Sequence, residues 1–199
     1  MIQIRNSIFE TNSSSTHALC ISMEDFFRTE IPEYKKIWRK TAKPLNIVGG
    51  EYGRSPQKPL VELEEKANYL WTAVLDYYSN YHWDNENNKK YYICTNKEKL
   101  EWWKEQILNE LPENSTLKDD YYDEYNAIDF PWIDHAAQME NFIKICENDP
   151  RYIHCLLDDE SFIEITGDEY PNFITAFLPH NEEQIICMPG RYAVYVKGN

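Results

Sequence analysis

The sequence lacks any long hydrophobic run, which argues against a helix that crosses a membrane. None of its windows approaches the roughly 18 consecutive apolar residues that such a helix needs. The N-terminal segment also lacks the basic stretch followed by an apolar stretch that is typical of a signal peptide. We therefore expect a protein that acts in the cytoplasm of its host cell and has no membrane partner.

The cysteines form neither a disulfide framework nor a zinc-binding pattern. The 5 cysteines are odd in number and scattered, and most lie in apolar runs such as YYIC and EQIIC. Such runs are typical of reduced, buried thiols. The cysteines and histidines also lack the paired spacing of zinc ligands. We expect no metal site, and the sequence identifies no cofactor.

Basic residues are scarce over most of the chain. The 20 Lys and Arg residues face 34 Asp and Glu residues, and the resulting net charge of −14 argues against non-specific nucleic-acid binding by the whole surface. The charge is unevenly distributed, because residues 1–59 carry a net charge of +3 and residues 60–199 carry −17. The positive charge is therefore concentrated in the N-terminal part of the chain.

The length and the apolar content of 42% suffice for one substantial core, so we expect residues 1–199 to form a single α+β domain. Short strands are predicted over residues 2–9 and 18–22, followed by a helix over residues 23–40 that Pro32 interrupts and a structured loop over residues 41–59. The clearest helix runs from Leu60 to Tyr78, with apolar residues on one face and Lys66 away from that face.

The second half of the sequence changes from helical to strand patterns. A strand over residues 91–95 precedes a helix over residues 97–111, which Asn96 caps and Pro112 ends. Residues 113–130 have no clear regular structure, and a further helix is predicted over residues 134–147. From Arg151 onward, turns separate five strand-like runs: YIHCLL, SFIEI, FITAFL, QIICM and YAVYV. These features predict central helices and a mainly antiparallel C-terminal sheet, arranged as a meander that N-terminal strands can join.

The segment from Arg5 to His17, RNSIFETNSSSTH, concentrates polar groups that can carry chemistry. Glu10 and His17 can move protons near neutral pH, which makes them the candidate catalytic pair. Hydroxyl, amide and guanidinium groups can hold a phosphate, and the candidates for this role are Arg5, Asn12, Ser13, Ser14 and Ser15. The alternative is a polar turn whose side chains bond their own backbone, with a structural histidine at its end.

Three blocks of sequence carry a resemblance to a known family. These blocks are the N-terminal run with RN followed by FETNSSSTH, GGEYG at residues 49–53, and KANYLWTA at residues 66–73. Together they resemble a family of uncharacterised proteins carried by bacteriophages and mobile elements, mostly of Gram-positive hosts. The resemblance covers roughly the first 75 residues well, and it implies a small accessory protein for which counter-defence, including CRISPR inhibition, is a common role.

Two charged segments are further candidates for partner binding. The first is a basic run with Tyr34 and Trp38 interleaved, a composition that can grip RNA or single-stranded DNA; its members are Lys35, Lys36, Arg39 and Lys40. The second is an acidic segment that can imitate a phosphate backbone; its members are Asp119, Asp120, Asp123 and Glu124. Each segment has a simpler alternative, which is a solvated helix face for the first and a solvated loop for the second.

Three functional hypotheses follow from the sequence. The leading one is a counter-defence protein, similar in role to an anti-CRISPR protein, that binds a host defence protein or nucleoprotein complex. The second is an enzyme that acts on RNA or a nucleotide through the segment from Glu10 to His17. The third is a protein that sequesters a signalling nucleotide without turning it over.

Overall fold

A computed structural model describes residues 15–23, 26, 33–53, 58–84, 89–121, 130–133, 139–167, 185–187 and 192–197. The helices of this part of the chain are α1 (Glu33–Thr41), α2 (Leu63–Tyr77), α3 (Lys97–Glu110), α4 (Glu140–Asn148) and α5 (Arg151–Leu156). The longer strands are β1 (Ser15–Ser22), β4 (Ser79–Asp84), β5 (Lys89–Cys94), β8 (Phe162–Gly167) and β10 (Tyr192–Lys197). The short strands are β2 (Asn46–Ile47), β3 (Glu51–Tyr52), β6 (Thr116–Leu117), β7 (Trp132–Ile133) and β9 (Ile185–Cys187).

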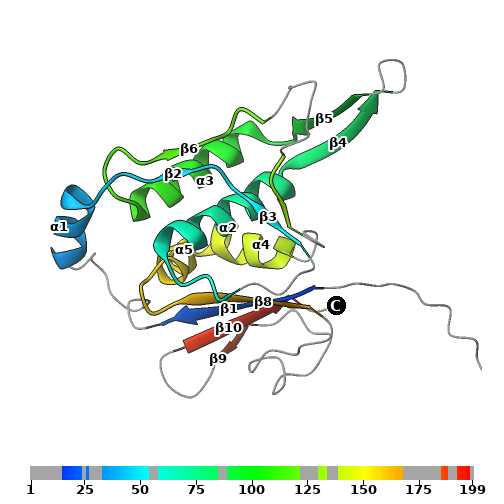
Figure 1. Ribbon diagram of the computed structural model, residues 1–199. Coiled ribbons are helices and arrows are strands. Elements are labelled where there is room, and N and C mark those ends of the chain that lie inside the picture. Colours follow the sequence, from blue (N-terminus) through cyan, green and yellow to red (C-terminus); the bar gives the residue numbers. More distant parts are fainter. Residues whose placement is uncertain are drawn as a thin grey trace, which may run out of the picture.

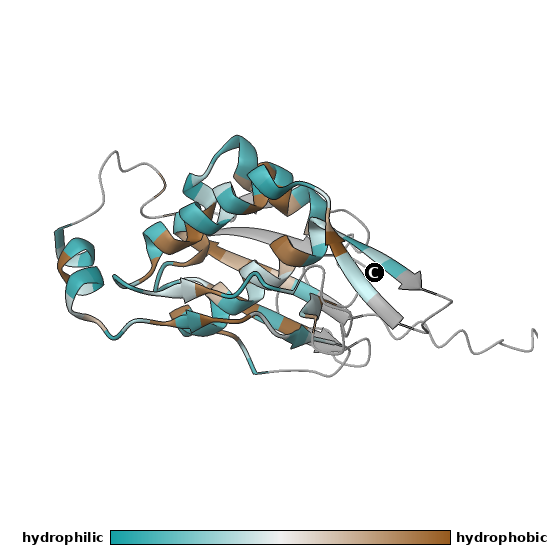
Figure 2. Cartoon of the chain, turned by 90° about the horizontal axis from the view of Figure 1, so that it is seen from above, coloured by the Kyte–Doolittle hydropathy of each residue, from teal (hydrophilic) through white to brown (hydrophobic). Residues whose placement is uncertain are grey.

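Helix α2 is the centre of the hydrophobic core. Its apolar residues recur at helical spacing, and nine of its residues are buried, among them Tyr69 and Trp71. The helix begins at Leu63 rather than at Leu60, because Leu60 pairs with Ile163 in an isolated bridge. Figure 2 shows hydrophobic residues concentrated on the helices in the middle of the molecule. Together, the helices and strands given above confirm the α+β fold class that the sequence predicts.

The helices form one layer of the molecule, and an antiparallel sheet lies below them (Figure 1). The strand order of this sheet is β8-β1-β10-β9. The prediction that N-terminal strands can join the antiparallel sheet is confirmed, but the C-terminal strands do not form an uninterrupted meander, because β1 lies between β8 and β10. His17, Leu19 and Ile21 alternate along β1, and Leu19 pairs with Ile163. This face of the sheet packs against the helices, so the N-terminal strand is an integral part of the core.

Several predicted elements agree with the structure. Helix α3 is capped at its start by the Asn96 side chain, which accepts a hydrogen bond from the Lys99 amide, and it ends before Pro112. Helix α1 covers residues 33–40 of the helix predicted over residues 23–40, whereas Pro32 and most of the predicted residues before it lie outside the described residues. Helix α4 overlaps the range predicted as helical and ends one residue beyond it, and β8, β9 and β10 match the predicted strand-like runs. The predicted strands over residues 2–9 and 173–178 lie outside the described residues.

The run YIHCLL is helical, so its prediction as a strand is wrong. Pro150 has a φ of −60°, which suits the first turn of a helix, and the Asp149 side chain accepts a hydrogen bond from the Arg151 amide. Ile153 and Leu156 are buried on the inner face of α5. The local start signal therefore outweighs the strand propensity of the apolar residues.

Two further differences concern segments without predicted structure. Residues 113–130 contain the short strand β6, which pairs in parallel with β2. Residues 79–84 form β4, which pairs with β5 in an antiparallel hairpin that projects from the helical layer (Figure 1). Among the described residues, no helix is both long enough and apolar enough to cross a membrane.

Candidate functional site

The C-terminal end of the N-terminal motif is packed in the protein interior. His17 lies in strand β1 rather than in an open loop, and it is fully buried. Its Nδ1 atom lies 2.7 Å from the Tyr69 hydroxyl, and the Tyr69 ring packs edge-on against Tyr52. This geometry is that of a structural histidine, because catalysis on a dissolved substrate needs a solvent-accessible group.

The GGEYG block lies against the KANYLWTA block. The Asn68 side-chain oxygen accepts hydrogen bonds from the amides of Val48 and Gly49 at 3.0 and 2.9 Å, and the Thr72 hydroxyl accepts one from the Gly50 amide at 2.8 Å. Gly49 has a φ of +77°, and a Cβ atom at this position would lie 2.8 Å from Pro131. The second and third sequence blocks therefore pack against each other, and His17 at the end of the first block contacts Tyr69 of α2.

The other residues of the N-terminal motif are placed as follows. Ser15 begins β1 opposite Gly167. The remaining candidates lie outside the described residues, and they are Arg5, Glu10, Asn12, Ser13 and Ser14.

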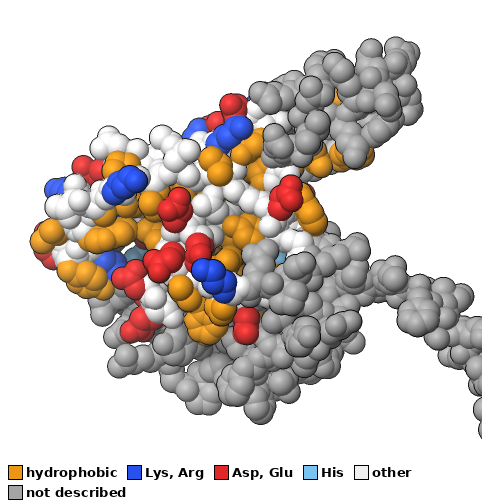
Figure 3. Space-filling model, in the orientation of Figure 1, with side chains coloured by type: hydrophobic (Ala, Val, Ile, Leu, Met, Phe, Trp, Pro, Cys, Tyr) orange, Lys and Arg blue, Asp and Glu red, His pale blue; other side chains and the backbone are white. Residues whose placement is uncertain are grey.

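Helix α1 contrasts with this interior cluster because none of its residues is buried. Tyr34, Ile37 and Trp38 are 61%, 56% and 42% exposed. Their spacing of i, i+3 and i+4 places them on one helical face. Figure 3 shows hydrophobic side chains gathered at the left end of the molecule, over α1. We call these three residues the α1 apolar face.

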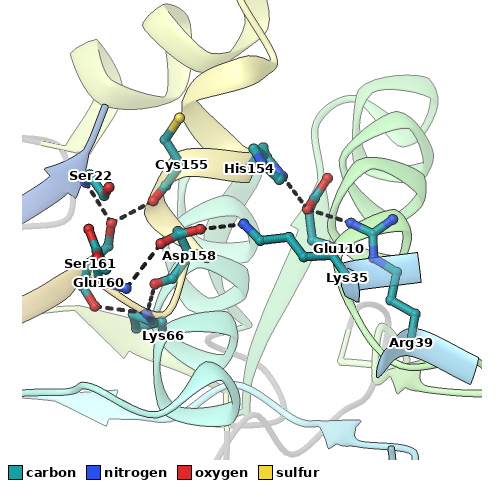
Figure 4. Close-up of polar contacts among 10 residues, drawn as sticks. All are labelled: Ser22, Lys35, Arg39, Lys66, Glu110, His154, Cys155, Asp158, Glu160 and Ser161. Atoms are coloured by element: carbon teal, nitrogen blue, oxygen red, sulfur yellow. Dashed lines mark hydrogen bonds and ion pairs between the residues drawn. The ribbon is translucent and has the colours of Figure 1, made fainter. Parts of the chain in front are cut away.

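Two ion pairs hold α1 against the rest of the protein. The Lys35 ammonium contacts the Asp158 carboxylate, and the Arg39 guanidinium lies 2.7 Å from the Glu110 carboxylate (Figure 4). The Glu113 amide also donates a hydrogen bond of 2.8 Å to the Arg39 carbonyl oxygen. Two cations of the basic run are therefore neutralised by carboxylates of the protein itself.

The other charged candidates have mixed environments. Lys36 lies 3.4 Å from Glu33 on the solvent side of α1, and Lys40 is exposed. Asp119 pairs with Lys104, and Asp120 lies 3.6 Å from Lys118. Asp123 and Glu124 lie outside the described residues. The described half of the acidic segment is thus partly neutralised.

A pocket of about 110 Å³ lies between α1 and the body of the protein. Tyr34 and Trp38 form aromatic walls, and Leu63 and Leu157 contribute apolar surface. The polar lining comes from distant parts of the chain and consists of Lys35, Arg39, Glu110, His154, Asp158 and Asp159. The volume is below the roughly 300 Å³ at which pockets for drug-sized ligands begin, so it suits a single side chain or a small ring.

The Glu110 carboxylate organises the polar side of this pocket. Its Oε2 atom contacts both the Arg39 guanidinium and His154 Nδ1, each at 2.7 Å (Figure 4). Asp158 joins Lys35 through one oxygen and accepts the Glu160 amide at 3.0 Å through the other. These bonds fix the positions of the lining side chains before any ligand binds.

Lys66 supports the turn that carries Asp158 and Asp159. Helical spacing predicted that this lysine lies away from the buried apolar face, and this prediction is wrong. The side chain is fully buried, and its ammonium donates to the carbonyl oxygens of Asp158 and Ser161. Burial lowers the pKa of Lys66 to about 8, against a smaller opposing effect of Asp159 and Asp158. The Ser161 hydroxyl completes the turn by donating to the Cys155 carbonyl oxygen at 2.5 Å.

Burial disfavours the thiolate form of two cysteines, Cys20 and Cys146. Burial raises the pKa of the Cys20 thiol to about 11 and also raises the pKa of Cys146. Among the described residues, no group of three or more His, Cys, Asp or Glu side chains can hold a metal ion.

No protein-family model, curated protein or solved structure matches the chain significantly.

Sequence reasoning recognised part of this site. It identified Lys35, Arg39 and the interleaved aromatic residues, but it missed Glu110, His154 and Asp159. These three residues come from α3, α5 and the turn after α5, and no local spacing relates them to α1. The sequence did contain a signal that His17 is buried. His17, Leu19 and Ile21 occupy alternate positions of the strand, so their side chains point to the same buried face.

Proposed function

We propose that the protein acts by binding a host defence protein through the α1 apolar face and the adjoining pocket. The single observation that supports this proposal is the exposure of three large apolar side chains on a helix that ion pairs hold in place. Residues at i, i+3 and i+4 are the anchors with which helices occupy apolar grooves of partner proteins. Tyrosine and tryptophan are also enriched among the residues that dominate binding energies.

A protein partner explains this surface better than a nucleic acid. Lys35 and Arg39 are already paired with carboxylates, and the pocket also presents the carboxylate of Asp159. Carboxylates repel the phosphates of RNA and DNA, and the chain as a whole carries a net charge of −14. The occupant is therefore a protein surface that combines apolar side chains with positive charge.

The counter-defence setting comes from the family resemblance of the three sequence blocks. Binding is sufficient for such a role, because an inhibitor that covers a functional surface of a defence complex needs no catalysis. The acidic character of residues 60–199 favours a partner with a basic surface, since opposite charges accelerate association. The enzyme and nucleotide-sequestration hypotheses gain no support from a fully buried His17.

The experiment measures phage plating on Gram-positive hosts that each carry one defined defence system, including CRISPR systems that target the phage. The wild-type chain is expected to restore plating in one of these hosts. The double variant Tyr34→Ala/Trp38→Ala is expected to lose this effect, because each anchor worth about 2 kcal/mol weakens binding roughly 30-fold.

The matched controls are Tyr81→Ala and Val61→Ala, which remove side chains that are 50% and 49% exposed and belong neither to α1 nor to the pocket lining. Both controls are expected to protect the phage as well as the wild type. Full protection by the α1 double variant, at equal protein abundance, would contradict the proposed binding surface. No protection by the wild type in any host would contradict the counter-defence role.

A further inference from the structure

The carboxylates beside α1 have hydrogen-bonding capacity that the protein does not use. Asp159 is exposed and has no ion-pair partner among the described residues. Glu110 uses its Oε2 atom for both Arg39 and His154, and its Oε1 atom has no partner in the described part of the chain. Three carboxylate oxygens are thus available to accept hydrogen bonds at the rim and on the wall of the pocket.

The two internal ion pairs leave one negative charge in the pocket lining. Lys35 neutralises Asp158, and Arg39 neutralises Glu110, so the charge of Asp159 remains. Buried Lys66 lies behind the turn and offsets part of this charge. The net charge of the pocket lining therefore contributes little to the choice of ligand. Hydrogen bonds to the carboxylate oxygens and contacts with the aromatic rings contribute more.

The aromatic walls add a second requirement for the ligand. Tyr34 and Trp38 present ring surface to the pocket, and Leu63 and Leu157 present apolar surface. A flat cation that donates several N–H groups satisfies both the rings and the carboxylates. The guanidinium group is planar and has five N–H donors, whereas the ammonium group of lysine is compact and strongly hydrated.

We propose that the pocket between α1 and the α5–β8 turn accepts the guanidinium group of an arginine side chain from the partner protein. The pocket volume of about 110 Å³ suits one such side chain rather than a larger ligand. This inference rests on the proposed function, because the arginine enters while the α1 apolar face covers the neighbouring surface of the partner. The shared carboxylate of Glu110 and the anchored turn at Asp158 hold the acceptors ready, so little ordering is needed on binding.

The test uses the full chain and free N-acetyl-arginine amide as the probe. Binding is followed by the NMR signal of the Trp38 indole N–H group, which is assigned by its loss in Trp38→Phe. The probe is expected to shift this signal in a saturable manner. N-acetyl-citrulline amide, which has a similar shape and no charge, is expected to bind roughly tenfold more weakly, as is N-acetyl-lysine amide.

Two variants distinguish a specific effect of the pocket carboxylate from a general effect of negative charge on arginine binding. Asp159→Asn removes an acceptor of the pocket, and Glu160→Gln removes the same charge from the neighbouring exposed residue, which does not line the pocket. Asp159→Asn is expected to weaken arginine binding several-fold, and Glu160→Gln is expected to leave it unchanged. Equal effects of the two variants, equal binding of arginine and citrulline, or no saturable shift would overturn the proposal.

The failure of this inference is distinguishable from the failure of the proposed function. If arginine does not bind but Tyr34→Ala/Trp38→Ala still abolishes phage protection, only the arginine pocket is wrong. If arginine binds with the expected selectivity but the α1 double variant still protects the phage fully, the pocket is retained and the proposed function is wrong.

Discussion

Helices α1 and α2 use aromatic residues in opposite ways. Helix α2 buries Tyr69 and Trp71 in the core, whereas α1 buries none of its residues and exposes Tyr34 and Trp38. The two helices also differ in how they are held, because α2 is surrounded by packed side chains and α1 is held mainly by ion pairs at its edge. The comparison indicates that α2 determines stability and that α1 is available for binding.

The largest expected effect is on the α2 side of this comparison. Trp71→Ala removes a fully buried side chain whose indole N–H group donates to the Lys118 carbonyl oxygen at 2.7 Å. We expect a loss of about 3–5 kcal/mol in the free energy of unfolding, because the cavity adds to the lost burial. Denaturant unfolding measures this loss, and a loss below about 1 kcal/mol would contradict the central position of α2.

Lys66→Met is the second change, and it keeps the length of the side chain. It leaves the carbonyl oxygens of Asp158 and Ser161 without their buried donor. We expect a loss of about 2–3 kcal/mol in unfolding free energy. The turn that lines the pocket is expected to loosen as well, which hydrogen exchange at the amides of residues 158–161 measures. Unchanged exchange would show that Lys66 does not hold this turn.

The difference in unfolding free energy between the wild type and Lys66→Met should depend on pH. Below about pH 8, Lys66 is protonated in both the folded and the unfolded state, so the cost of burying its charge is fully present. Between about pH 8 and 10.5 only the unfolded state binds the proton, and the contribution of Lys66 to stability rises with pH. The wild type should therefore gain up to about 3 kcal/mol relative to Lys66→Met across this range. A pH-independent difference between the two unfolding free energies would contradict the lowered pKa.

Gly49→Ala has a smaller expected effect on the surroundings of α2. The substitution forces a side chain into a backbone conformation with positive φ and into contact with Pro131. We expect a loss of about 1–2 kcal/mol, measured by thermal or denaturant unfolding. Gly53 is a matched control, because its φ is not positive and a Cβ atom added there would meet the edge of the Trp132 ring at 3.2 Å rather than a proline ring. A loss as large for Gly53→Ala would show that Gly49 has no special role.

The smallest expected change in stability belongs to α1. Tyr34→Ala and Trp38→Ala remove exposed side chains, so each should alter the unfolding free energy by no more than about 0.5 kcal/mol. Each variant should nevertheless weaken partner binding roughly 30-fold. A stability loss of several kcal/mol in either variant would place these rings in the core and would remove the contrast between the two helices.

The sequence predicts the elements with strong local signals and misses contacts between distant segments. The periodicity of α2 and the cap at Asn96 were sufficient to locate α2 and α3, because these signals act within a few residues. Pro150 was also such a signal, but the apolar run after it favoured a strand. The position of β1 between β8 and β10 depends on long-range pairing, which no local pattern contains.

The candidate site shows the same limit. The basic and aromatic residues of α1 were visible in one short run, and His17 was visible as part of the N-terminal motif. The pairing of Arg39 with Glu110 and of Lys35 with Asp158 joins residues far apart in the sequence, so these acceptors were missed. Lys66 was assigned to the polar side of its helix because helical spacing places it away from the apolar face. Its partners are backbone carbonyl groups, which the residue types do not reveal.

The most direct test of the central claim compares phage protection by Tyr34→Ala/Trp38→Ala and by Tyr81→Ala in the sensitive host, with the unfolding free energy measured for the same proteins. We expect the α1 double variant to fold as stably as the wild type but no longer to protect the phage, whereas Tyr81→Ala should both fold and protect. Full protection by the stable α1 double variant would contradict the claim that α1 is the binding surface.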